Sequence, residues 1–443
     1  MFQTMRNAWK IPELRKKILY TLFIIIIFRV GSAITVPFLL TDQVSAWMSN
    51  AASDGNFLEY LNVLTGGALS KATIFSLSIT PYINASIIIQ LLTYALPPLE
   101  RLQSEGEEGR KKLNRITSIV SLGLSFFMSF AYYLTLKNKM NAVKYTEGGA
   151  GIFAASVIIA CFAAGSLLVI WLGNRISEKG IGNGVSMILF AGIIARMPID
   201  VGTSLGLMRS NPQKYVFIVP LVGLIFIFMI GFIVLMNEAE RRIPIQYAKR
   251  VVGRKQYGGQ NTHIPIKVCM SGVMPIIFAM AFMSLPSTLA LFVTPVNAIT
   301  DTTTTGQKFY YNFIHFFSTQ SWGYAVLYFV LIIAFNYFYV SMQYNPVEIA
   351  NNLRQSNGGI PGIRPGKPTS DYIQRILSKI TLVGAIFLGL IAIFPIAFAR
   401  ALPDMSGLSM GGTSILIVVS VALETIRTME SQMMMRHHKG FLE

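Results

Sequence analysis

The sequence predicts an all-α integral membrane protein with about ten transmembrane helices in two inverted halves of five. Three observations support this prediction: composition, the length of the apolar stretches and the distribution of charge. Of the 443 residues, 53% are hydrophobic and 13% are charged, and the mean hydropathy is +0.54. A soluble protein of this size needs more polar residues to cover its surface, so lipid is the expected solvent for much of the chain.

Ten apolar stretches approach or exceed the roughly 20 residues that a helix needs to cross a bilayer. The first stretch follows a basic leader, but it is too long for the apolar region of a signal peptide and has no convincing cleavage site, so we interpret it as a span. The predicted spans are 18–38, 75–96, 116–136, 152–172, 182–198, 215–236, 268–293, 322–342, 376–398 and 411–428.

The distribution of basic residues predicts the orientation of these spans. With the amino terminus in the cytoplasm, 27 of the 37 Lys and Arg residues fall on the cytoplasmic side and 9 on the external side. This threefold bias follows the positive-inside rule, so we expect both termini in the cytoplasm of a multi-pass protein of the inner cell membrane. The net charge of +17 then gives a basic cytoplasmic face, which suits anionic lipid or ribosomal RNA.

Two predicted cytoplasmic segments, 237–267 and 343–379, are longer than a turn requires, and long ordered connections often carry function. The second contains a run of glycines and prolines at 358–366 that surrounds Arg364. Glycines permit tight turns and prolines restrict the backbone, so the run predicts a stiff hairpin that displays Arg364. A flexible linker explains the same residues equally well.

Local matches between the two halves support an inverted repeat, with an amino-terminal half at 1–200 and a carboxy-terminal half at 201–443. An odd number of spans in each half forces the halves into opposite orientations. The second span of each half has an internal proline followed by isoleucine, and the fifth opens with glycines followed by an aliphatic residue. The matched pairs are Pro81 with Ile83, Pro275 with Ile277, Gly184 with Leu189, and Gly412 with Ile417. Interrupted spans at matching positions point to a central pathway.

A secondary transporter shares these features, but transporters usually place ionisable groups at mid-membrane, and the span interiors hold almost none. Arg29 is the main exception, and we interpret it as a snorkelling or structural residue. No His-Glu-x-x-His, intramembrane aspartate pair or Walker motif is present, so we expect no enzymatic activity, cofactor or metal. Cys161 and Cys269 are interpreted as small buried hydrophobic residues.

Several strings, in this order along almost the whole chain, resemble the signatures of the SecY family of protein-conducting channels. They are Gly66-Gly67-Ala68-Leu69-Ser70-Lys71-Ala72, Thr80-Pro81-Tyr82-Ile83-Asn84-Ala85-Ser86-Ile87-Ile88-Ile89-Gln90, Gly180-Ile181-Gly182-Asn183-Gly184, Pro361-Gly362-Ile363-Arg364-Pro365-Gly366 and Gly411-Gly412-Thr413-Ser414.

The resemblance implies an hourglass channel that passes unfolded preproteins across the cytoplasmic membrane and releases hydrophobic segments laterally into lipid. Its waist is a ring of aliphatic side chains that resists hydration without binding ions. The corresponding residues in this sequence are Ile79, Ile83, Leu189, Ile277 and Ile417.

The resemblance also implies a plug, a short helix near 57–72 that closes the external funnel, where an external amphipathic loop is the alternative. The plug residues are Gly66, Gly67, Ala68, Leu69 and Ser70. A lateral gate is implied between spans two and three on one side and seven and eight on the other. Its candidate polar residues are Asn84, Gln90 and Thr93.

The partners implied by the resemblance are SecE-type and SecG-type small membrane subunits, the motor ATPase SecA, the ribosome, preproteins with signal sequences, and membrane lipids. SecA and the ribosome would share the two long cytoplasmic segments. The candidate contact residues are Arg364, Lys249, Arg250, Arg254 and Lys255.

Overall fold

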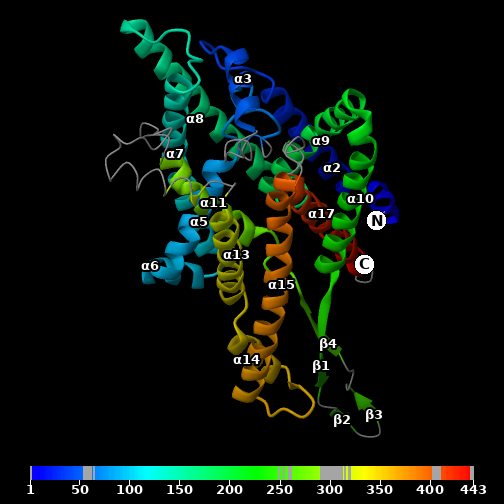
Figure 1. The fold of residues 1–443 in the computed structure, drawn as a ribbon. Helices are drawn as coiled ribbons and strands as arrows, with labels where there is room; N and C mark the ends of the chain where they lie inside the picture. Colours follow the sequence, from blue (N-terminus) through cyan, green and yellow to red (C-terminus); the bar gives the residue numbers. More distant parts are fainter. Residues whose placement is uncertain are drawn as a thin grey trace.

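The computed structural model describes residues 2–52, 62, 65–247, 250–252, 255–257, 262–289, 313, 316–317, 321–401 and 411–439. These residues form a bundle of long helices with a small region of strands that protrudes at one end (Figure 1). We call this end the ribbon end, because strands β1 (Glu240–Tyr247) and β4 (Thr262–Lys267) pair there as an antiparallel ribbon.

Each of the ten predicted spans overlaps a helix. The described helices up to residue 210 are α1 (Phe2–Lys10), α2 (Pro12–Gly31), α3 (Thr41–Ala52), α5 (Thr80–Ala95), α6 (Pro97–Ser104), α7 (Glu107–Asn138), α8 (Gly148–Lys179) and α9 (Gly184–Ser210). Those that follow are α10 (Pro212–Glu238), α11 (Met274–Leu289), α13 (Trp322–Gln343), α14 (Pro346–Gln355), α15 (Lys367–Ala401) and α17 (Gly411–Lys439). The remaining described strands are β2 (Arg250–Val252), β3 (Lys255–Tyr257) and β5 (Gly358–Gly359).

Within the part of the chain that the structure describes, six helical segments are long and apolar enough to cross a membrane. They are α7, α8, α9, α10, α15, and α13 taken together with α14. Helices α5 and α6 give a seventh if they are counted as one span with a 105° bend. The predicted all-α membrane fold is therefore confirmed.

The boundaries of the first two spans differ from the prediction. Helix α2 begins at Pro12 and ends at Gly31, whereas the span was expected at 18–38, and α5 begins only at Thr80. Between the two, a β-bridge pairs Thr35 with Thr73. Hydropathy finds apolar stretches but does not separate helix from buried irregular backbone, so it extended both spans into non-helical chain.

Pro81 and Pro275 do not interrupt helices, contrary to the interpretation from sequence. Each is the second residue of its helix, α5 or α11, where a missing N–H donor costs no hydrogen bond. Ile83 and Ile277 are accordingly the fourth residues of those helices. The two halves are therefore similar in how these helices begin, and not in an interruption within a helix.

The non-helical segment that leads into α5, residues 65–79, is mostly buried inside the bundle. Its backbone is held by neighbouring chain: the Val36 N–H donates to the Ala72 carbonyl at 3.1 Å, and the Ile74 N–H donates to the Ile34 carbonyl at 2.9 Å. The Tyr132 hydroxyl donates to the Leu69 carbonyl at 2.9 Å. These bonds are needed because lipid cannot satisfy irregular backbone at membrane depth.

The two long connecting segments form one structure at the ribbon end. Strand β5, which lies in the 343–379 segment, pairs with β1 of the 237–267 segment, so the three-stranded sheet has the order β4-β1-β5. Apolar side chains from both segments pack beneath it with the ends of α13 and α15. Buried members of this cluster are Ile243, Ile245, Ile266, Met270, Val340, Leu353, Ile360, Ile373 and Leu377.

A buried polar network joins the start of α11 to α13 and α15. The Ser271 hydroxyl donates to the side-chain oxygen of Asn336 on α13, and the Asn336 amide donates to the Thr381 carbonyl on α15 at 2.9 Å. Asn336 is 3% exposed. Because α11 carries Ile277, this asparagine holds a candidate pore helix against the rest of its half.

Replacing Asn336 with alanine should lower the free energy of unfolding by about 1 to 3 kcal/mol, because a buried hydroxyl and carbonyl lose their partner. Thermal unfolding in mild detergent measures the change. The matched control is Tyr337→Phe, which removes the bond from the neighbouring hydroxyl to the Ser378 carbonyl at 3.1 Å on the exposed surface. An equal loss in both variants would contradict the assigned role.

Candidate functional site

Four of the five predicted ring residues lie in one apolar cluster that joins the two halves of the chain. Its buried members include Ile79 before α5, Leu189 on α9 and Ile417 on α17, at 0%, 6% and 2% exposure, and half-buried Ile83 packs against it. Helix α9 belongs to the first half and α17 to the second.

Ile277 is the ring residue that lies outside this cluster. It is half-buried on α11 between Val273 and Met280, which occupy the same helix face one turn away on either side. Both neighbours pack against the ring cluster and also against the large apolar cluster of the second half. The face of α11 that carries Ile277 therefore adjoins the cluster that contains the other four ring positions.

Four of the five ring positions lie in the first two turns of a helix, so where each helix begins determines where its ring residue lies. Ile83 and Ile277 are in the first turn of α5 and α11, and Leu189 and Ile417 are in the second turn of α9 and α17. The start of α9 is set by Asn183, whose side-chain oxygen accepts from the Val185 N–H at 3.1 Å. Four helix starts thus bring aliphatic side chains to one region.

Residues 65–70 of the predicted plug lie inside the bundle, on the side of the ring away from the ribbon end. A Cβ at Gly66 would lie 2.6 Å from the Gly192 carbonyl oxygen and 2.7 Å from the Arg29 Nη1 atom. Gly192 follows Leu189 by one turn of α9. An external loop does not describe these residues, since Ala68 and Leu69 are each 1% exposed.

The plug prediction is described only in part. Residues 57–61 and 63–64 lie outside the described residues. Residues 65–70 are a turn rather than a helix, and Gly66 has φ +67 and Gly67 φ +85. Ser70 N–H donates to the Asn62 side-chain oxygen at 3.0 Å, so the turn is closed by a side chain from the preceding segment.

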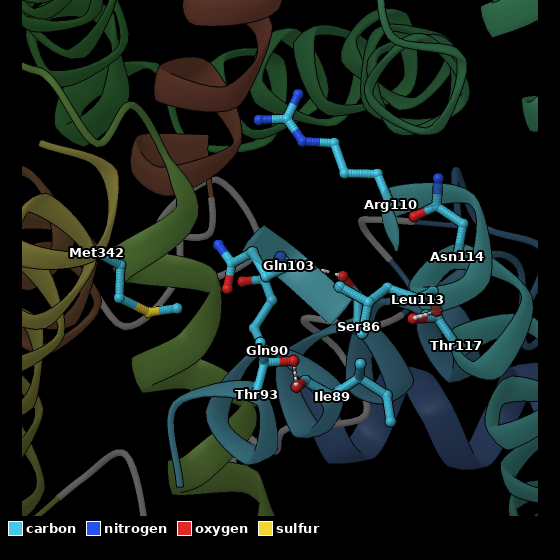
Figure 2. A pocket seen from close by; sticks show the side chains of 10 residues that line it. All are labelled: Ser86, Ile89, Gln90, Thr93, Gln103, Arg110, Leu113, Asn114, Thr117 and Met342. Carbon is cyan, nitrogen blue, oxygen red and sulfur yellow. Dashed lines mark hydrogen bonds between the residues drawn. The ribbon is translucent and has the colours of Figure 1, made fainter. Parts of the chain in front are cut away.

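The three predicted gate residues lie along α5, and two of them line a cavity of about 210 Å³ at its ribbon-directed end (Figure 2). Gln90 donates to the Ser86 hydroxyl at 3.4 Å, and Thr93 donates to the carbonyl of its own helix at Ile89 at 2.7 Å. The cavity lining comes mainly from two helix faces: Ser86, Ile89, Gln90 and Thr93 of α5 with Arg110, Leu113, Asn114 and Thr117 of α7; Gln103 of α6 and Met342 of α13 complete it.

Asn84 is not part of this cavity, and its amide contacts the Met128 sulfur of α7 at 3.9 Å. Sequence reasoning missed the residues that approach from the other half. Tyr94 of α5 and Phe338 of α13 meet edge to face with ring centroids 5.5 Å apart, and Met342 reaches the cavity one turn further along. The sequence feature that could have indicated this contact is the presence of aromatic residues near the ends of two predicted spans.

Three of the five predicted partner residues are described, and they lie at the ribbon end. Arg364 is exposed in a turn held by two bonds, from the Ile363 N–H to the Ile360 carbonyl at 3.1 Å and from the Thr369 hydroxyl to the Arg364 carbonyl at 2.9 Å. Arg250 and Lys255 lie on β2 and β3, whereas Lys249 and Arg254 lie outside the described residues.

Where the ribbon joins the bundle, basic and acidic groups meet. Burial, and secondarily the charge of Arg427, lower the pKa of Lys267 at the end of β4, while Glu240 and Glu424 act in the opposite direction. The Arg427 guanidinium also donates to the Asn237 carbonyl at 3.0 Å. This bond joins α17 to the end of α10, from which the ribbon continues.

Comparison with known proteins decides the family. The SecY family model matches residues 73–426. The chain belongs to the SecY family. It is 40% identical over 450 residues to the protein translocase subunit SecY of Thermotoga maritima, covering 100% of this chain and 98% of the relative. It is 37% identical over 449 residues to the same subunit of Streptomyces coelicolor, covering 100% of both chains.

Solved structures share the SecY fold. A protein-conducting channel matches with a TM-score of 0.63 at 17% identity, covering 96% of both chains. A SecY structure whose plug domain stabilises the closed state and maintains a membrane seal has a TM-score of 0.62 at 17% identity, also covering 96% of both chains. A channel solved in the canine ribosome-channel complex has a TM-score of 0.59 at 16% identity and the same coverage.

The close packing around Gly66 can be tested by measuring ion leakage through the channel. Gly66→Ala should displace residues 65–70 and raise ion leakage, because its Cβ would clash with the Gly192 carbonyl and Arg29. Gly67→Ala has the same positive φ but meets nothing within 4 Å, so it isolates backbone strain and should raise leakage less. Conductance in planar bilayers measures both. Equal leakage in the two variants would contradict the packing assigned to Gly66.

Proposed function

We propose that this SecY-family channel moves unfolded preproteins across the cytoplasmic membrane through the aliphatic ring and releases hydrophobic segments laterally into lipid. The observation that carries the proposal is the shared apolar cluster of Ile79, Ile83, Leu189 and Ile417, to which both halves contribute. Apolar constrictions exclude hydrated ions, and aliphatic side chains make no directional bonds with a passing peptide. The ring therefore accepts any sequence while it resists leakage.

The proposal assigns the plug to residues near 57–72 and the seal to their packing on α2 and α9. Burial of Ala68 and Leu69 and the fit of Gly66 against Gly192 support this assignment. The plug domain of the SecY protein with a similar fold, which maintains a membrane seal, favours it as well. The family match favours a channel over the alternative of a secondary transporter.

The lateral gate in this proposal is the seam between α5 with α7 and α11 with α13. The side-chain contact between Tyr94 and Phe338 and the neighbouring cavity, which is partly lined by polar side chains, support a seam that opens easily. Polar contacts between membrane helices are worth only about 1 kcal/mol each, so a hydrophobic signal sequence can displace them. Asn84, Gln90 and Thr93 remain the proposed polar residues of the gate.

The proposal places the ribbon end and both termini in the cytoplasm, where SecA and the ribosome bind. The joining of both long segments in one sheet supports a single docking surface, and Arg364 is exposed on it. A channel of similar fold was solved in a complex with the ribosome. SecE-type and SecG-type subunits complete the assembly, and the chain itself has no enzymatic role, so SecA supplies the energy.

Ile83→Asn or Ile277→Asn tests the ring. An amide brings water into a constriction that depends on dryness, so each variant should export a reporter with a defective signal sequence better than the unmodified channel does. Reporter export is measured alongside expression of the channel. Ile88→Asn is the control, because Ile88 is on the same helix but 39% exposed on its outer side. Poor export with poor expression of the ring variants would mean that these isoleucines only pack.

Arg364→Glu tests the docking surface. The variant should insert and unfold like the unmodified protein but lose SecA-driven export, because it reverses an exposed charge and removes no buried contact. Export into proteoliposomes with purified SecA is the measurement. Arg354→Glu, a reversal at another exposed arginine of the same segment, is the control. Normal export by Arg364→Glu would refute the assignment.

A further inference from the structure

Arg29 is a charged residue inside the first span, and the proposed function assigns no role to it. It lies near the end of α2 away from the ribbon end, and its Nη1 atom is buried without a hydrogen-bond partner among the described residues. An unpaired guanidinium donor at membrane depth is costly, since a buried donor without an acceptor loses the bonds that water would supply. Such a group normally marks function.

The position of this donor relates it to the plug. Gly66 lies between Arg29 Nη1 and the Gly192 carbonyl oxygen, with so little room that a Cβ would be within 2.7 Å of both. With Gly66 in place the Nη1 atom does not donate to this carbonyl. Removal of Gly66 would leave the donor facing an acceptor and water.

The segment that occupies this place is itself strained. Ala72 and Ser78 both have φ +45, a region that residues with a side chain seldom adopt. The Ser78 hydroxyl is a second buried group without a hydrogen-bond partner among the described residues. Strained backbone and unpaired polar groups cluster where a segment must leave its place.

We propose that Arg29 is a positioning residue for channel opening: its unpaired Nη1 donor raises the energy of the closed state and gains an acceptor when the plug leaves. The acceptors that become available are the Gly192 carbonyl, pore water and the backbone carbonyls of the translocating chain. This inference rests on the proposed role of residues 57–72 as the plug. Arg29 is thus expected to shift the equilibrium between the closed and the open channel toward the open channel.

The experiment combines Arg29→Met with removal of residues 60–70 in the full-length channel. Methionine keeps an unbranched apolar side chain but has no donor to leave unpaired. With the plug present, Arg29→Met should reduce both resting open probability in planar bilayers and the rate of reporter export by about fivefold or more, the effect of one unpaired donor. In the plug-deleted channel the same substitution should change neither quantity.

Two comparisons separate this role from a structural one. Arg209→Met removes an exposed charge from the same end of the molecule and should leave both measurements unchanged. Expression and thermal unfolding are recorded for every variant. If Arg29→Met is not recovered as a folded protein, Arg29→Leu, which also has no donor and a shorter side chain, replaces it with the same expectation.

The outcomes are distinct. If deletion of residues 60–70 leaves leakage unchanged, the proposed plug fails and the role of Arg29 fails with it. If deletion raises leakage but Arg29→Met raises leakage too, Arg29 holds the plug closed, and only the inference is overturned. An equal loss of export with and without the plug likewise overturns the inference, because it indicates a contribution to folding alone.

Discussion

The backbone of residues 65–79 must be satisfied without water, and the arrangement of the channel depends on this constraint. Lipid offers no hydrogen bonds, so irregular chain at membrane depth persists only where protein surrounds it. Here the bridge partners on the 32–40 segment and the Tyr132 hydroxyl supply the bonds. On α8, Gly165 lets the Ile74 carbonyl approach so closely that a Cβ there would lie 2.0 Å from it. A buried turn therefore replaces the first part of the expected span.

This buried turn delays the start of α5, and the delay determines where the candidate pore lies. Ile79 and Ile83 enter the ring cluster because the helix begins at Thr80 and not some five residues earlier. In the second half α11 begins after a similar non-helical approach at 268–273, which the Asn336 network ties to α13 and α15. Each half thus contributes a helix that begins inside the protein.

The sequence was sufficient for the class of fold and for the position of every predicted span, because about 20 consecutive apolar residues have few other uses. It was insufficient for helix ends. Pro81 and Pro275 were taken as interruptions because proline is unfavourable within a helix, but the same residue is favourable in a first turn, and only the chain before it separates the two cases. Resemblance to a family supplied ring residues that polarity alone would assign to packing.

Contacts between segments that are far apart in the chain could not be predicted from the sequence. The pairing of β5 with β1 joins residues more than a hundred positions apart through a strand of only two residues, which has no recognisable pattern of its own. The encounter of Tyr94 with Phe338 likewise follows from how the two halves meet. Polar residues drew attention to Asn84 and Thr93, yet their bonds stay within the first half.

The contacts between the two halves differ between the two sides of the molecule on which the halves meet. On one side α9 continues into α10 through Asn211, and the apolar ring cluster contains residues of both α9 and α17, so parting the halves there would expose apolar core. On the other side α5 and α13 share an aromatic pair and border a cavity that is lined by both polar and apolar side chains. Parting the halves on that side exposes groups that water can solvate. We therefore expect the halves to part more easily on the cavity side, while the covalent connection at Asn211 limits their separation on the other side.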